Sequence, residues 1–158
     1  MKQFKIKYIV IFLLLIVILG VSGKFNQKLA QTQDTEDKIN ISPQLLEQYK
    51  KDYTQEIIMA EKCDLNMDKK EDAVIIYREN KSQNFMVVVV TDGESYYITE
   101  PVKAPLEKQS IKFKNIDEKN EMEVIVSGEK NGNLGYAIFR IEDRKFKDIF
   151  AEGMESCC

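Results

Sequence analysis

The sequence predicts a mainly β domain, an antiparallel meander, that follows an N-terminal membrane helix and a short amphipathic helix. Short runs rich in β-branched and aromatic residues recur from residue 56 onward, and turn dipeptides separate several of them. The apolar fraction of 44% and the charged fraction of 31% are typical of a folded globular protein. Residues 42–150 are enough for one β-rich domain with its own core.

An uncharged run, Tyr8–Gly23, follows Lys2, Lys5 and Lys7. The preceding lysines predict that the N-terminus is cytoplasmic and the rest of the chain extracytoplasmic. The run has 16 residues, or about 24 Å as a helix, which is slightly short for a bilayer core of about 30 Å. Residues 1–23 are therefore either a retained single-pass anchor in the cell membrane or a signal peptide whose cleavage yields a secreted protein.

Residues 24–41 are polar and are expected to form a tether. Ser42 and Pro43 then form the pattern of a helix N-cap followed by proline at the first helical position. Apolar residues recur after them at helical spacing, namely Leu45, Leu46, Tyr49 and Tyr53. This pattern predicts a short amphipathic helix that packs on the sheet.

The strands are expected in eight short runs. They are Glu56–Lys62, Ala73–Arg78, Phe85–Thr91, Ser95–Thr99, Ile111–Lys114, Glu123–Ser127, Leu134–Ile141 and Phe146–Phe150. Asp92-Gly93 and Asn131-Gly132 predict hairpin turns. Pro101 and Pro105 predict a long irregular connection in the centre of the domain.

The charge and the composition exclude several functions. The net charge is −3, and the three lysines of residues 1–23 leave the remainder more acidic still, without a basic stripe, which argues against a nucleic-acid partner. The chain has no histidine, so a Ser-His-Asp triad and histidine-ligated zinc are excluded. The carboxylates are spread over turns and faces, so no enzyme active site is expected.

The sequence contains a weak internal repeat, in which each copy is an acidic loop followed by an apolar strand. Residues 63–76 align with residues 114–127 at an offset of 51. The first loop places oxygen-bearing side chains at positions 1, 3, 5 and 9, which are Asp64, Asn66, Asp68 and Asp72. Alternating oxygens of this kind can hold Ca²⁺, and they can equally form a metal-free Asx-type turn. In the second loop Asn115, Asp117 and Glu123 remain, but Lys119 replaces the third ligand.

The first loop resembles the Asp-rich loops of FG-GAP and VCBS-type β-propeller repeats, over roughly residues 56–150. It departs from them at Lys69, where those loops usually place glycine. The resemblance implies a pair of propeller-type repeats. Two repeats are too few to close a ring, so either one folded sheet or a fragment of a propeller-like meander is expected.

The chain has three cysteines, Cys63, Cys157 and Cys158. Cys63 precedes the acidic loop and is either a small buried hydrophobic residue or a third thiol that acts with the adjacent pair Cys157 and Cys158. Adjacent Cα atoms lie about 3.8 Å apart, below the roughly 4.4–6.8 Å of ordinary disulfides, so a bond between Cys157 and Cys158 would be strained and easily reduced. When reduced, the pair offers two soft thiolates suited to Hg²⁺, Cu⁺ or As(III).

The layout of a membrane segment, a repeat-like β domain and the pair Cys157 and Cys158 resembles the Cys-Cys-COOH (seleno)protein family, SaoC. The resemblance implies a selenoprotein-associated system that handles mercury. It implies partners such as a thioredoxin-like (seleno)protein, an organomercurial lyase and transport proteins.

Three functions follow from these residues. In the first, Cys157 and Cys158 capture or transfer a soft metal, most simply mercury, and Cys63 adds a third ligand. In the second, the same pair cycles between dithiol and disulfide with a thioredoxin-like partner. In the third, the domain is a non-enzymatic binding module with a calcium loop, formed by Asp64, Asn66, Asp68 and Asp72.

Overall fold

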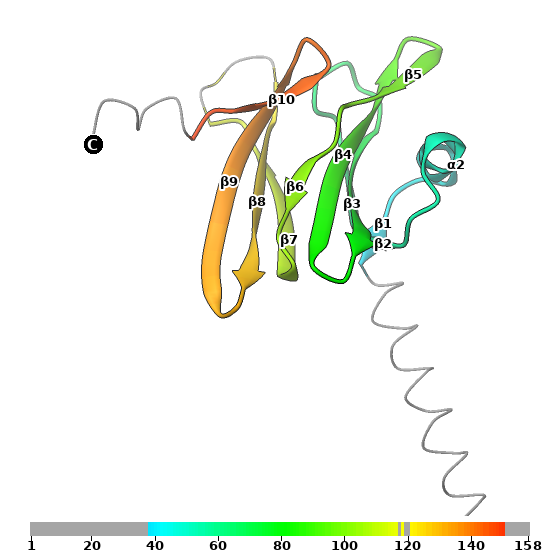
Figure 1. The fold of residues 1–158 in the computed structure, drawn as a ribbon. Coiled ribbons are helices and arrows are strands. Elements are labelled where there is room, and N and C mark those ends of the chain that lie inside the picture. Colours follow the sequence, from blue (N-terminus) through cyan, green and yellow to red (C-terminus); the bar gives the residue numbers. More distant parts are fainter. Residues whose placement is uncertain (1–37, 117, 119–120, 151–158) are drawn as a thin grey trace, which may run out of the picture. The chain divides into compact units, whose positions relative to one another are not determined.

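The computed structural model describes residues 38–150 except 117, 119 and 120. The predicted mainly β fold with antiparallel strands and one short helix is confirmed in this part of the chain (Figure 1). The alternative of one folded sheet is wrong, because the strands form two sheets. No helix among the described residues has the length and hydropathy that crossing a bilayer requires. The expected anchor, residues 1–23, lies outside the described residues.

The first sheet contains six strands in the order β1-β2-β3-β4-β5, with β6 also paired to β4. Only β1 pairs in parallel, with β2, and all the other pairs are antiparallel. The strands are β1 (Ile39–Asn40), β2 (Ile57–Cys63), β3 (Asp72–Asn80), β4 (Gln83–Asp92), β5 (Ser95–Ile98) and β6 (Val102–Ala104).

The second sheet is an antiparallel meander in the order β10-β9-β8-β7. Its strands are β7 (Glu107–Lys114), β8 (Glu123–Lys130), β9 (Asn133–Glu142) and β10 (Lys145–Asp148). All eight expected strands are therefore found, with bounds that shift by a few residues. Both expected hairpins are also found, but the first turns at Gly93-Glu94, one residue later than expected, because Asp92 still pairs with Ser95. At Asn131 and Gly132 both φ angles are positive, as a type I′ turn requires.

The two meanders are copies of one unit. Strands β2 and β3 map onto β7 and β8 at an offset of 51, and β4 and β5 map onto β9 and β10 at an offset of 50. The same faces of the copies also look in the same direction. Ala73 and Ile75 face the helix side of the first sheet, whereas their counterparts Val124 and Val126 belong to the core between the sheets. The copies therefore stack front to back.

A helix covers the back of the first sheet. The helix α2 (Pro43–Asp52) begins after Ser42 and buries Leu45 and Tyr49 against that sheet, as its apolar spacing predicted. Both faces of β3 and β4 are consequently buried. This double burial explains why apolar residues follow one another in these strands without alternating with polar ones. In Figure 1, α2 lies beside the green strands of the first sheet.

Two short strands were not expected from the sequence. Strand β1 lies inside residues 24–41, where a polar tether is predicted, and Ile39 packs with the core under α2. Strand β6 lies between Pro101 and Pro105, where an irregular connection is predicted. The prolines flank this edge strand without entering it, so they remove no ladder hydrogen bond.

Candidate functional site

Cys63 is the last residue of β2, opposite Asp72, the first residue of β3. Its thiol is half-buried and packs against the core between the sheets, as a small hydrophobic side chain does. Burial raises the pKa of the Cys63 thiol, and the nearby Asp64 and Asp72 carboxylates raise it further. The neutral thiol therefore predominates, and Cys63 is a poor nucleophile in the folded protein.

We expect iodoacetamide at pH 7.5 to modify Cys63 at least about tenfold more slowly in the folded protein than in denaturant. The measurement uses Cys157→Ser plus Cys158→Ser, so that Cys63 is the one thiol that reacts. The same variant in guanidinium chloride is the control. Equal rates in the two conditions would show that the fold neither shields the Cys63 thiol nor raises its pKa.

The acidic loop between β2 and β3 directs its oxygens at its own backbone. The two carboxylate oxygens of Asp64 accept the amide N–H groups of Asp68 at 3.0 Å and Lys69 at 2.7 Å. Asn66 Oδ1 accepts from Asp68 N at 3.1 Å, and Asp68 Oδ1 accepts from Lys70 N at 2.9 Å. This is the hydrogen bonding of the Asx-type turn. At Lys69 the φ angle is 69°, so a lysine occupies the left-handed position that glycine would fill without strain.

Asp72, the fourth expected ligand, has a different role. Its side chain is fully buried, and it accepts the N–H groups of Leu65 at 2.9 Å and Thr91 at 2.8 Å. It thereby ties the acidic loop and β4 to the start of β3. Across residues 38–150, with the gaps given above, no three His, Cys, Asp or Glu side chains are grouped as a metal site would need.

The second repeat reuses this buried acid. Glu123, the counterpart of Asp72, accepts the N–H of Ile116, the counterpart of Leu65, at 2.6 Å. Glu123 also forms a buried ion pair with Arg140 of β9, whose Nε lies 3.0 Å from Glu123 Oε1. The offset of 51 aligns Glu123 with Asp72, and this alignment could have indicated the shared role. Asp117 and Lys119 of the second loop lie outside the described residues.

The buried Asp72 predicts an unusual dependence of stability on pH. Burial raises its pKa from 3.8 to about 6, although its two backbone hydrogen bonds oppose the rise. The folded state thus binds this proton more tightly than the unfolded chain does, and stability falls as the pH rises from about 4 to about 6. Relative to Asp72→Asn, the wild type should lose on the order of 2–3 kcal/mol over this range.

Urea denaturation at several pH values measures this difference. Asp68→Asn, which removes an exposed carboxylate of the same loop, is the matched control and should retain most of the wild-type slope, because the charge of Asp68 is a lesser cause of the raised pKa of Asp72 than burial is. The prediction is wrong if Asp72→Asn and the wild type keep a constant difference between pH 4 and pH 7.

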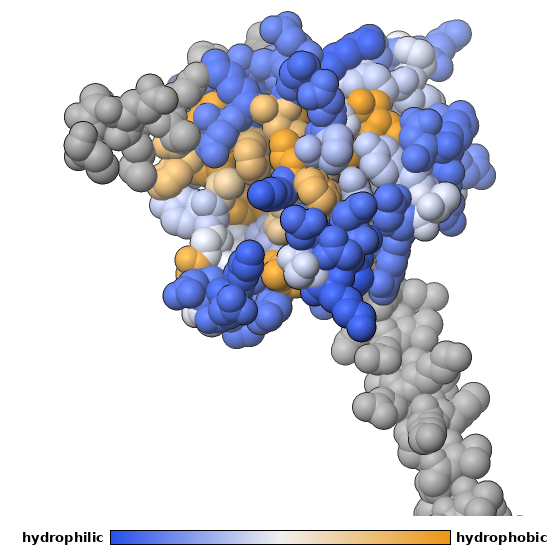
Figure 2. Space-filling model, viewed as in Figure 1, coloured by the Kyte–Doolittle hydropathy of each residue, from blue (hydrophilic) through white to orange (hydrophobic). Residues whose placement is uncertain are grey.

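A groove of about 510 Å³ lies between the two sheets, at the end formed by the β3–β4 and β8–β9 turns. Asn84 lines it and donates from Nδ2 to the carbonyls of Pro105 and Leu106, at 2.8 and 3.4 Å. Gly128 and Gly135, which face each other across β8 and β9, leave its floor without side chains. Figure 2 shows apolar atoms gathered in the region between the sheets, framed by hydrophilic ones. The sequence does not predict this groove, because its walls come from strands far apart in the chain.

The structure brings Cys63, Asp64 and Asp72 together around the start of the acidic loop. Cys157 and Cys158 lie outside the described residues, as do residues 24–37 of the expected tether. Comparison of the chain with protein-family models, curated proteins and solved structures finds no match.

Proposed function

We propose that this chain is a membrane-tethered, extracytoplasmic thiol protein whose vicinal Cys157 and Cys158 bind or transfer a soft metal ion. The observation that carries the proposal is the adjacency of the two cysteines. Two thiolates on one short arm can coordinate a soft cation that prefers two sulfur ligands, of which Hg²⁺ is the expected example. The resemblance to the Cys-Cys-COOH (seleno)protein family points to the same metal.

The described domain supports a non-enzymatic scaffold role. Its buried acids are bound to backbone N–H groups or to Arg140, so they are occupied in holding the fold together. Cys63 has a raised thiol pKa and packs in the core, which leaves the vicinal pair as the thiols with a chemical role. The Asx-type hydrogen bonds of the acidic loop favour a structural turn over a calcium site.

We further infer that the scaffold is a two-repeat fragment of a propeller-like design. Front-to-back stacking of four-stranded antiparallel sheets is how propeller blades pack. Here α2 covers one end of the stack.

Titration of the full-length protein in detergent with HgCl₂, while free thiols are counted, tests the metal proposal. We expect one Hg²⁺ per chain, with the loss of two free thiols and with binding that survives competition by a millimolar monothiol. Cys157→Ser plus Cys158→Ser should abolish this binding, whereas Cys63→Ser, the matched single-thiol control, should retain it. Binding that persists in the double variant would overturn the proposal.

The strained geometry of adjacent cysteines favours one other role, a thiol-disulfide relay with a thioredoxin-like partner. Reversible oxidation of the pair by such a partner, without tight Hg²⁺ binding, would assign the relay instead. The same two serine substitutions serve in both measurements.

A further inference from the structure

The second sheet has an open edge where the first sheet has a strand. In the first repeat, β6 pairs with the N-terminal part of β4, and the paired residues include Val102 with Met86 and Ala104 with Asn84. The corresponding stretch of β9 is Leu134–Tyr136. No strand among the described residues pairs with its outer edge. Leu134 and Tyr136 are 76% and 56% exposed there.

The chain leaves both repeats along the same path. After β5, Thr99 N donates to Val88 O at 3.0 Å. After β10, Ile149 N donates to Ile138 O at 2.9 Å. At an offset of 50, Ile149 is the counterpart of Thr99 and Ile138 is the counterpart of Val88. The repeat is therefore still intact one residue beyond the end of β10.

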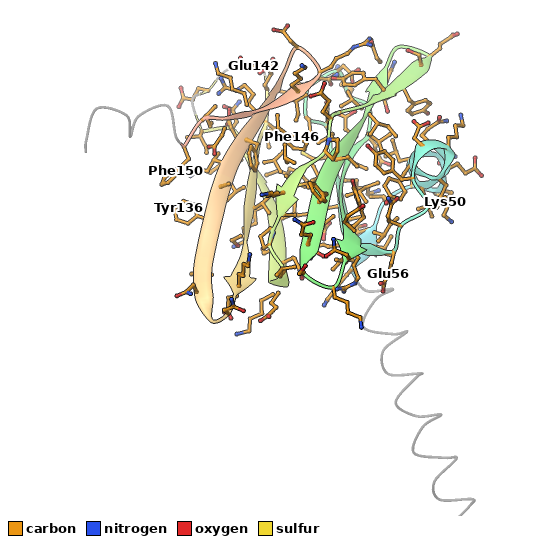
Figure 3. All side chains as sticks on the ribbon, viewed as in Figure 1. Lys50, Glu56, Tyr136, Glu142, Phe146 and Phe150 are labelled. Carbon is orange, nitrogen blue, oxygen red and sulfur yellow. The ribbon has the colours of Figure 1, made fainter. Side chains whose placement is uncertain are left out.

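The next residue extends this path. The ring of Phe150 lies 4.8 Å from the ring of Tyr136, centroid to centroid. Figure 3 shows these two side chains together beside β9. The chain thus runs antiparallel along β9 toward the open stretch, in the direction that β5 takes toward β6.

We propose that residues 152–154 form the counterpart of β6 and pair antiparallel with Leu134–Tyr136 of β9. The offset of 50 places these residues, which lie outside the described part, on Val102–Ala104. It sets the register as Glu152 opposite Tyr136, Gly153 opposite Gly135 and Met154 opposite Leu134. Val102 packs against the buried core between the sheets. Its counterpart, residue 152, would adjoin the face of the second sheet where Leu134 and Tyr136 are exposed, so a glutamate fits at this position.

The pairing also places the thiols. Cys157 follows Met154 by three residues, a reach of about 10 Å in extended chain. Docking therefore holds the cysteine pair close to the β8–β9 turn. The pairing itself involves main-chain groups, so it stands or falls independently of any metal bound by the thiols.

Amide hydrogen exchange measured by NMR, on the full chain and on a chain that ends at Phe150, tests the pairing. Because Ile138 O faces the outer edge, alternation directs the N–H groups of Leu134 and Tyr136 outward, and those of Gly135 and Ala137 toward β8. We expect the outward amides to exchange at least about tenfold faster in the shortened chain. The inward amides are the internal control and should be unchanged.

Two proline variants of the full chain sharpen the test. Glu152→Pro removes an N–H that faces β9 in the proposed register, whereas Gly153→Pro removes one that faces away. The first should reproduce the fast exchange of the shortened chain, and the second should keep the slow exchange. Equal exchange in the full and shortened chains, or equal effects of the two prolines, would overturn the proposal. Protection that grows with protein concentration would also overturn it, by assigning the edge to a second copy.

Discussion

Replacing Arg140 with methionine should cost about 3–5 kcal/mol of unfolding free energy, because it leaves the carboxylate of Glu123 buried without its cation. Glu123 is fully buried and Arg140 is 6% exposed, so water replaces little of the lost interaction. Two further carboxylates, Glu121 and Glu142, lie 3.5 Å from the guanidinium and would then repel each other and Glu123. Urea denaturation of the full chain measures the loss.

Two comparisons separate the buried charge from ordinary loss of packing. Arg140→Met combined with Glu123→Gln removes both charges and should recover much of the stability, because the remaining amide is neutral. Lys108→Met breaks an exposed ion pair with Glu129, in which Lys108 is 72% exposed, and should cost less than about 1 kcal/mol. The account is wrong if Arg140→Met costs no more than Lys108→Met, or if the double variant is as unstable as the single one.

The sequence predicted the strands well because each carries a local signal. Most apolar residues of β3 and β4 are β-branched, and polar turns bound both strands. The two hairpin dipeptides contain residues suited to positive φ angles. The helix was equally visible, since Leu45 and Tyr49 fall on one face. The offset of 51 between the two acidic loops was visible in the sequence, but the arrangement of the strands in two stacked sheets rather than one depends on long-range packing.

Features that depend on a partner far along the chain were missed. Strands β1 and β6 are too short to show a period, and each forms only because a neighbouring strand offers an edge. The turn between β9 and β10 places Asp143 and Arg144 at positive φ, and it lacks the glycine that would have predicted such a turn. Arg144 is held there by Asp92 and by the ring of Tyr97, 4.7 Å away, and both lie about fifty residues earlier in the chain.

The acidic loop shows why residue type alone left the site ambiguous. Oxygens at alternate positions suit either a cation or the backbone of the turn itself. In the folded loop the N–H groups of Asp68, Lys69 and Lys70 point inward and donate to these oxygens, which residue type alone does not reveal. The buried position of Asp72 likewise arises from β4, through the N–H of Thr91.

Gly128→Ala should destabilise the protein by about 1–3 kcal/mol, as overpacking of a tight contact does. A Cβ at this position would lie 2.4 Å from Pro105 Cβ and 2.7 Å from the carbonyl oxygen of Glu107. The proline ring is rigid and the carbonyl belongs to the start of β7, so neither can move without displacing the link between the two sheets. Urea denaturation measures the loss.

Gly135→Ala is the matched control for this substitution. Gly135 is the registered partner of Gly128 across β8 and β9, and a Cβ there meets no atom within 4 Å. The strand conformation suits alanine at least as well as glycine, so this variant should be neutral or slightly more stable. Equal losses in the two variants would mean that the strands themselves, rather than the contact with Pro105, require glycine. A larger loss for Gly128→Ala would show that the close approach of β8 to Pro105 is what requires glycine at this position.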